Sequence, residues 1–380
     1  MLGSAAHIHE LHLHNCRLLD GEKGLAAALP LLPQLQHLGV VANEGSSGRA
    51  LAFPSSSLQA LQQLTHLQLA AHLDQPNGFQ HLQGLTALQD LRFENLGDPT
   101  YEASCLSGLE LLTRLEIRGA DAFTLFEPGV LSGKSCLQHF EVVGCMVAGG
   151  QAGITQLLQV LQQMQQLEFL SLPGAVLHDA RGPPVTAYAA LTASSKLQHL
   201  DLSSCTLPTR VWQHIFPMRR QLPHLRRLAV AYVEHPFSSA QPARERDAIE
   251  GEQPLAEQVT GPGAAAVPEG HRLVSCCPGQ QSLDLRCLQY SGELLAPLAA
   301  LSGLRELSLG SSPSPPSGLD VLLRRLGVFD LNDDVNLLSN LAPLRQLTYM
   351  NYGGLSRLDI ACTAVSAWVG AGCVSILHTV

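Results

Sequence analysis

A repeated leucine pattern constrains this chain more than any other feature. The pattern L-x-x-L-x-L-x-x-(N/C) returns along almost the whole sequence, with 24 to 30 residues between successive starts from Ile8 to Leu225. Full copies begin at Ile8, Leu35, Leu137 and Leu197. Weaker copies begin at Leu64, Leu88, Leu112, Leu167, Leu225, Gln280 and Leu304, with two poor ones at Leu323 and Leu344. Such a period is typical of a stack of similar coils and not of separate compact domains.

The spacing within the pattern has a structural reason. Side chains alternate along a strand, so the fourth and sixth positions point to one side, and the first leucine packs in the turn before the strand. The ninth position leaves the strand where backbone groups need partners. Cys16, Cys145 and Cys205 occupy this position, and we interpret them as structural residues, not as catalytic residues or metal ligands.

The composition excludes two classes of protein. The chain contains 71 leucines in 380 residues, and 46% of its residues are hydrophobic, which is too many for a wholly disordered chain. The net charge of -9 argues against a protein that reads a nucleic acid through its phosphates. The sequence therefore predicts a folded repeat protein without a nucleic-acid partner.

The repeats resemble those of the leucine-rich repeat superfamily over about residues 8 to 352. The resemblance implies an α/β solenoid, a horseshoe with a parallel sheet on the concave face and helices or irregular returns on the convex face. The stripe Ile154, Leu157, Leu158 and Leu161 predicts one amphipathic return helix. Weaker stripes lie in residues 209–222 and 292–301.

Two stretches break the repeats, residues 234–270 and residues 311–317, and the first of these breaks together with the end of the repeats divides the chain into four segments. Residues 1–233 form an N-terminal block of repeats, residues 234–270 an insertion, residues 271–352 a C-terminal block, and residues 353–380 a C-terminal cap or irregular tail. The insertion has seven acidic and two basic residues, is rich in Pro, Gly and Ala, and is expected to be disordered. Residues 361–380 carry no charged side chain, so a membrane tail anchor is the alternative to a cap.

Targeting and redox signals favour a cytoplasmic protein. The first residues contain no basic segment followed by an apolar one, as a secretory signal would. The ten cysteines form no C-x-x-C pair or dense framework, so reduced thiols are expected. No asparagine begins an Asn-x-Ser/Thr acceptor.

Motifs for catalysis are missing from the sequence. It contains no G-x-S-x-G, no G-x-x-x-x-G-K-S/T, no H-E-x-x-H and no kinase motif, so we predict neither an enzyme nor a cofactor. His12 and His14, with Glu10 beside them, form an H-x-H pair that could bind a metal. Because the sequence indicates no third or fourth ligand for this pair, no metal site is predicted.

The candidate binding surface consists of the third, fifth and seventh repeat positions, which face away from the core. Arg and acidic residues alternate there, a pattern that favours a complementary protein over a polyanion. The side chains are expected to be solvated. The predicted site comprises Asp90, Arg92, Glu94, Arg114, Glu116, Arg118, His139, Glu141, His199 and Asp201.

These observations predict a non-enzymatic scaffold that binds a protein partner through the concave surface, and the composition does not favour a membrane role. Two alternatives stay open. One is the substrate-recognition part of an F-box-type ubiquitin-ligase adaptor, whose F-box would have to lie outside this sequence. The other is a structural component of the cytoskeleton or of the ciliary axoneme, which would change the expected localisation.

Overall fold

The structure is a computed structural model in which two compact units are distinguished. The first comprises Met1–Leu177 with Arg181–Leu202, and the second His178–Ala180 with Ser203–Val380. Each is described separately. The residues described are 7–14, 21–41, 52–70, 72–73, 78–96, 106, 108–119, 124–179, 181–208, 210–218, 220–231, 270–286, 297–310, 349–353 and 375–377.

The first unit contains a parallel sheet whose strands follow one another in chain order. The strands are β1 (Glu10–His14), β2 (His37–Val41), β4 (His66–Ala70), β6 (Asp90–Leu96), β7 (Arg114–Gly119), β9 (His139–Val143), β11 (Phe169–Ser171) and β12 (His199–Asp201). Every one of these strands begins at the third position of a repeat. Equivalent positions are therefore register partners on neighbouring strands, as in Asp90↔Arg114 and Arg114↔His139.

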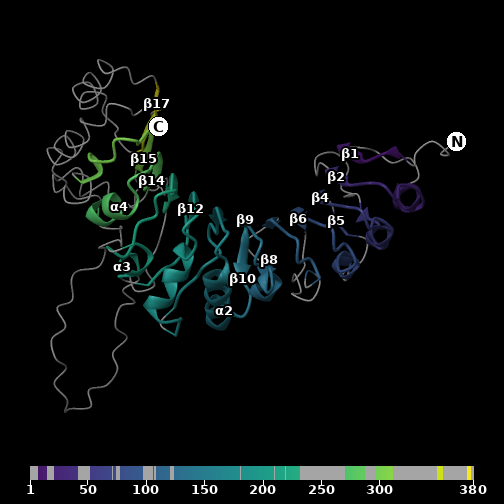
Figure 1. Cartoon of the computed structure of the whole chain (residues 1–380), viewed down its shortest axis with the longest axis horizontal. Coiled ribbons are helices and arrows are strands. Elements are labelled where there is room, and N and C mark those ends of the chain that lie inside the picture. The colour runs from purple at the N-terminus through teal and green to yellow at the C-terminus, as the bar shows by residue number, and fades with distance from the viewer. Residues whose placement is uncertain are drawn as a thin grey trace, which may run out of the picture. The chain divides into compact units, whose positions relative to one another are not determined.

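The segments that connect these strands contain helices, which lie together on one side of the sheet (Figure 1). They are α1 (Gly21–Ala28), η2 (Leu29–Leu31), η3 (Ser55–Ala60), η4 (Gly78–Leu82), η6 (Pro128–Leu131), α2 (Gly150–Gln163) and η7 (Val185–Thr192). The helix predicted from residues 154–161 is confirmed as α2, which buries all four leucine and isoleucine side chains of the stripe. The predicted α/β leucine-rich repeat solenoid is confirmed in its sheet, its register and its returns.

Leucines at the first, fourth and sixth positions form the core, as the spacing requires. In the repeat that begins at Leu197, the side chains of Leu197, Leu200 and Leu202 are all buried. Cys145 and Cys205, at the ninth position, are buried too. Their structural interpretation agrees with this burial, while Cys16 lies outside the described residues.

Two additional pairs of short parallel strands were not predicted from the sequence. They are β3 (Ala52–Phe53) with β5 (His72–Leu73), and β8 (Thr124–Phe126) with β10 (Cys145–Val147). Between β9 and β10 the chain turns at Gly144, which has φ of +67°. A Cβ atom on Gly144 would lie 2.9 Å from the carbonyl oxygen of Gly119, so this turn requires glycine by its conformation and by its packing.

The second unit contains a further run of parallel strands and two short helices. These are α3 (Trp212–Ile215), β13 (Arg227–Ala229), α4 (Gly270–Cys276), β14 (Ser282–Asp284), β15 (Glu306–Gly310), β16 (Tyr349–Gly353) and β17 (Ser375–Leu377). β16 begins at Tyr349, so its repeat starts at residue 347 and the start expected at Leu344 was wrong by three positions. The copy expected at Leu323 lies outside the described residues.

The predicted insertion separates two strands that are neighbours in this sheet. Arg227 of β13 pairs with Ser282 of β14, so the sheet continues between residues on either side of the insertion. Residues 232–269 lie outside the described part of the chain, and Gly270, the last residue assigned to the insertion, is the first residue of α4. Within the described residues, no helix has the length and apolar character needed to cross a bilayer.

One buried charge in the core of the first unit gives a direct test of the packing. Lys134 is 1% exposed, its Nζ atom has no hydrogen-bond partner, and burial lowers the pKa of its ammonium group. Replacing it by methionine, which keeps the volume without the charge, should raise the free energy of unfolding by about 1–3 kcal/mol. Urea unfolding of Lys134→Met measures this change, and a loss of stability would contradict the burial of Lys134.

Candidate functional site

The ten predicted site residues all lie on one face of the sheet of the first unit. Eight of them form three rows, two across β6, β7 and β9 and one across β6 and β7, because equivalent repeat positions are paired. The rows are Asp90↔Arg114↔His139, Arg92↔Glu116↔Glu141 and Glu94↔Arg118. His199 and Asp201 lie on β12 and are separated from this group by β11.

The three arginines of this surface are each bound to a carboxylate of the same surface. Arg92 donates from Nε and Nη2 to the two oxygens of Asp90, at 3.0 and 2.9 Å. The Arg92, Arg114 and Arg118 side chains are 34%, 35% and 46% exposed, so the expected solvation holds for Arg118, whereas Arg92 and Arg114 are partly buried. The surface is a set of preformed ion pairs.

Glu116 is the most buried charged group of the surface. Its side chain is 4% exposed, and its Oε1 atom accepts hydrogen bonds from Nε (2.7 Å) and Nη2 of Arg114. Burial alone would raise the pKa of Glu116, but the contacts with His139 and Arg114 outweigh it and lower the pKa to about 2. Glu116 is therefore ionised at neutral pH and depends on its cationic neighbours for its stability in the fold.

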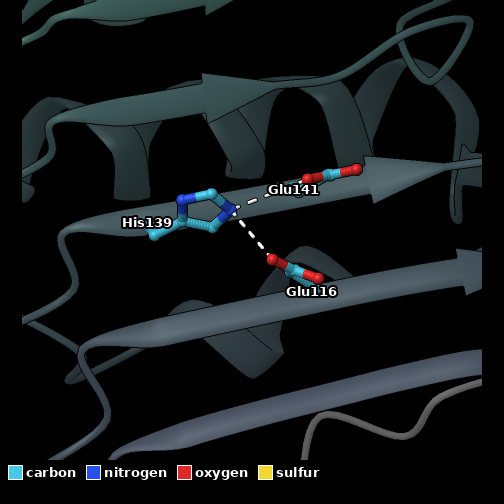
Figure 2. A group of neighbouring side chains, drawn as sticks. All are labelled: Glu116, His139 and Glu141. Carbon is cyan, nitrogen blue, oxygen red and sulfur yellow. Dashed lines mark ion pairs between the residues drawn. The ribbon is translucent and has the colours of Figure 1, made fainter.

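His139 lies between two carboxylates (Figure 2). Its Nε2 atom is 3.2 Å from Oε1 of Glu116 and 3.6 Å from Oε2 of Glu141. Burial lowers the pKa of His139, but the two carboxylates outweigh it and the net shift is upward. The same contact with His139 lowers the pKa of Glu141, whose other oxygen, Oε1, accepts a hydrogen bond from Nη2 of Arg118 at 3.0 Å.

An aromatic stack joins the two separated parts of the site. Phe169 of β11 lies between His139 and His199, with ring centroids 4.0 and 4.1 Å away and interplanar angles of 12° and 5°. The sequence analysis did not select Phe169, although it occupies the third position of the repeat that begins at Leu167. Including the third position of every repeat among the candidates, whether polar or apolar, would have selected Phe169.

The histidines of the first strands also lie on this face. The rings of His12 and His14 are 6.1 Å apart, and those of His37 and His66 stack at 4.1 Å. Burial and the neighbouring His37 lower the pKa of His66. Neither pair belongs to the one cluster of potential metal ligands found among the described residues, which consists of Glu116, His139 and Glu141.

The cysteines of the described residues differ strongly in accessibility. Cys136 is exposed, whereas Cys145, Cys205, Cys276 and Cys277 are buried. Burial raises the pKa of the Cys276 and Cys277 thiols, which keeps them protonated at neutral pH.

We expect iodoacetamide to modify Cys136 in the native protein at least about 10-fold faster than Cys277, because the thiolate is the reactive form and must be reached by the reagent. Peptide mass spectrometry after timed labelling measures both rates. Equal rates for the two residues in native protein would contradict the burial of Cys277, and labelling in denaturant provides the control.

Comparisons with known proteins show a likeness to solved structures only. No protein-family model matches this chain, and no curated protein matches it at a significant level. An internalin from Listeria monocytogenes str. 4b F2365 is 15% identical, with 80% of each chain covered and a TM-score of 0.45. A TDR receptor is 16% identical, with 92% of this chain and 52% of the receptor chain covered and a TM-score of 0.47, so this chain spans about half of that receptor. Both likenesses are too distant to carry an argument about function, and the fold assignment rests on the repeats and the parallel sheet themselves.

Proposed function

We propose that this chain is a non-enzymatic scaffold that binds a protein partner through the exposed face of the sheet in its first unit. The observation that carries this proposal is the continuous surface formed by β6, β7, β9, β11 and β12, on which the charged residues of β6, β7 and β9 lie beside the stack of Phe169 with His139 and His199. Aromatic residues and arginines are enriched in protein-binding sites, and this surface offers both.

The ion pairs favour a protein over a nucleic acid as the partner. Arg92, Arg114 and Arg118 each already contact a carboxylate, so a phosphate would have to compete with it for the guanidinium group. A protein can instead present charges of both signs in the matching order, which improves specificity. The adaptor and cytoskeletal roles stay predictions from the sequence, because no described contact favours either.

Reversal of one exposed charge tests the proposed surface. Arg118 makes one ion pair, with Glu141, and is the most exposed of the three arginines. We expect Arg118→Glu combined with Phe169→Ala to reduce partner capture by about 30-fold or more, the effect of losing an interface hot spot of about 2 kcal/mol. Affinity capture from cell lysate with quantitative mass spectrometry identifies the partner with the unaltered chain and measures its loss with the variant.

The matched control reverses a charge away from this face. Lys196 is an exposed lysine in the turn before β12, so Lys196→Glu changes the net charge by the same amount as Arg118→Glu. Capture should be unchanged in this control. If Lys196→Glu removed the partner while the Arg118 and Phe169 variant retained it, the binding surface would have to lie elsewhere on the chain.

A further inference from the structure

Three potential metal ligands meet on the exposed sheet face of the first unit. Glu116 of β7 and Glu141 of β9 are register partners, and His139 precedes Glu141 by two residues on the same strand and the same face. One ligand atom from each of the three side chains lies within 4.8 Å of the other two (Figure 2). Two rigid strands, not loops, therefore position the whole cluster.

The imidazole of His139 has a nitrogen whose bonding is incomplete. Nε2 is buried and makes no hydrogen bond of normal geometry, although two carboxylate oxygens lie 3.2 and 3.6 Å away. The stacked ring of Phe169, at 4.0 Å, limits how far the imidazole can rotate to improve either contact. A buried polar atom without a hydrogen bond calls for an explanation, and a bound ion is one that the two facing carboxylates would suit.

The distances around Nε2 match those between ligands of one ion. Two atoms that are each about 2.0–2.1 Å from a tetrahedral zinc ion lie about 3.3 Å apart. The separations of 3.2 and 3.6 Å between Nε2 and the two oxygens are close to this value. Small side-chain movements would bring all three atoms to bonding distance of a shared ion.

We propose that Glu116, His139 and Glu141 bind one divalent cation of the zinc type. One imidazole and two carboxylates are a donor set that zinc accepts, whereas magnesium and calcium prefer oxygen donors alone. Three protein ligands leave a fourth position for water or for a side chain of a bound protein. The site thus differs from the structural zinc sites of proteins, in which four protein ligands close the coordination sphere.

The neighbouring arginines set the strength of this site. Arg118 donates a hydrogen bond to Oε1 of Glu141, while Oε2 of the same carboxylate faces His139. Arg118 therefore holds the carboxylate with Oε2 free to bind the ion, in the way that residues behind the ligands orient them in other metal sites. Arg114 contacts Oε1 of Glu116, the oxygen that also faces His139, and its positive charge opposes the cation. We therefore expect weaker zinc binding than at three-ligand sites without cationic neighbours.

Titration of the full chain with zinc chloride tests the proposal. Protein stripped with EDTA is titrated in a calorimeter, together with His139→Gln and Glu141→Gln. Each variant should lose one equivalent of bound zinc, or bind it more than about 10-fold more weakly, because even loss of an outer group costs about 10- to 100-fold. His199→Gln is the matched control, since His199 lies on the same row beyond Phe169, and it should retain the wild-type number of sites.

Cobalt separates this site from the cysteines of the chain. Co²⁺ bound to nitrogen and oxygen gives visible bands without the charge transfer that a thiolate produces, and those bands should vanish in both variants. Circular dichroism verifies that each variant is folded, and the conservative Glu141→Gln replaces His139→Gln if the latter unfolds. A folded variant that keeps both the zinc stoichiometry and the zinc affinity of the wild-type chain, or no zinc uptake by the wild-type chain, would overturn the proposal.

Discussion

Replacing Leu200 by alanine is expected to lower the free energy of unfolding by about 2–5 kcal/mol. Leu200 is fully buried on β12, and its register partner Leu170 is fully buried on β11. The substitution removes apolar contacts and leaves a cavity that a layer of stacked coils cannot close easily. Because each coil rests on the next one, the loss should extend to neighbouring repeats and lower the cooperativity of unfolding.

Urea denaturation followed by circular dichroism measures this effect. The control is Gln198→Ala, two residues earlier, whose exposed side chain donates a hydrogen bond from Nε2 to Oε2 of Glu168 and whose loss should change stability by about 0.5 kcal/mol or less. Hydrogen exchange on the strands then shows how far the destabilisation spreads. Equal midpoints for Leu200→Ala and Gln198→Ala would contradict the register of the repeat.

The fold was predictable because the leucine pattern and the strand register express the same constraint. Side chains at the fourth and sixth positions must both face the core, so the residues around them must be in strand conformation. The strands accordingly begin at the third position, as at Arg114 and His139. The extra strands β8 and β10 escaped prediction, because they depend on the turn at Gly144 and its close contact with Gly119. No periodicity in the sequence encodes such a contact.

The candidate site was predictable as a set of positions but not as a network. The pattern places Arg114 and Glu116 on one face, yet it does not say that Arg114 pairs along its own strand while Arg118 crosses to Glu141 on β9. Those choices depend on side-chain rotamers and burial. For the same reason the sequence could not indicate that His139 would lie between two carboxylates and against Phe169.

The network also changes what reversal of the arginines should do. With all three side chains solvated, reversing Arg114 would barely affect stability. In the structure Arg114 is the guanidinium partner of the buried carboxylate of Glu116. We expect Arg114→Glu to lower the free energy of unfolding by about 2–4 kcal/mol, because a buried charge that loses its partner is strongly destabilising and a second carboxylate would repel it.

Arg118→Glu is the matched control for this prediction, because it makes the same change on the same strand. Arg118 is 46% exposed, so its ion pair with Glu141 is screened by water and its reversal should cost no more than about 1 kcal/mol.

The destabilisation by Arg114→Glu should also shrink as the pH falls. Without Arg114, burial raises the pKa of Glu116 from its low value, so the carboxyl group can take up a proton and lose its unfavourable charge. Urea unfolding of both variants at pH 7 and pH 4.5 measures these differences. Equal losses for the two variants at pH 7 would mean that Glu116 is as accessible to water as Glu141, and that the buried centre of the network does not exist.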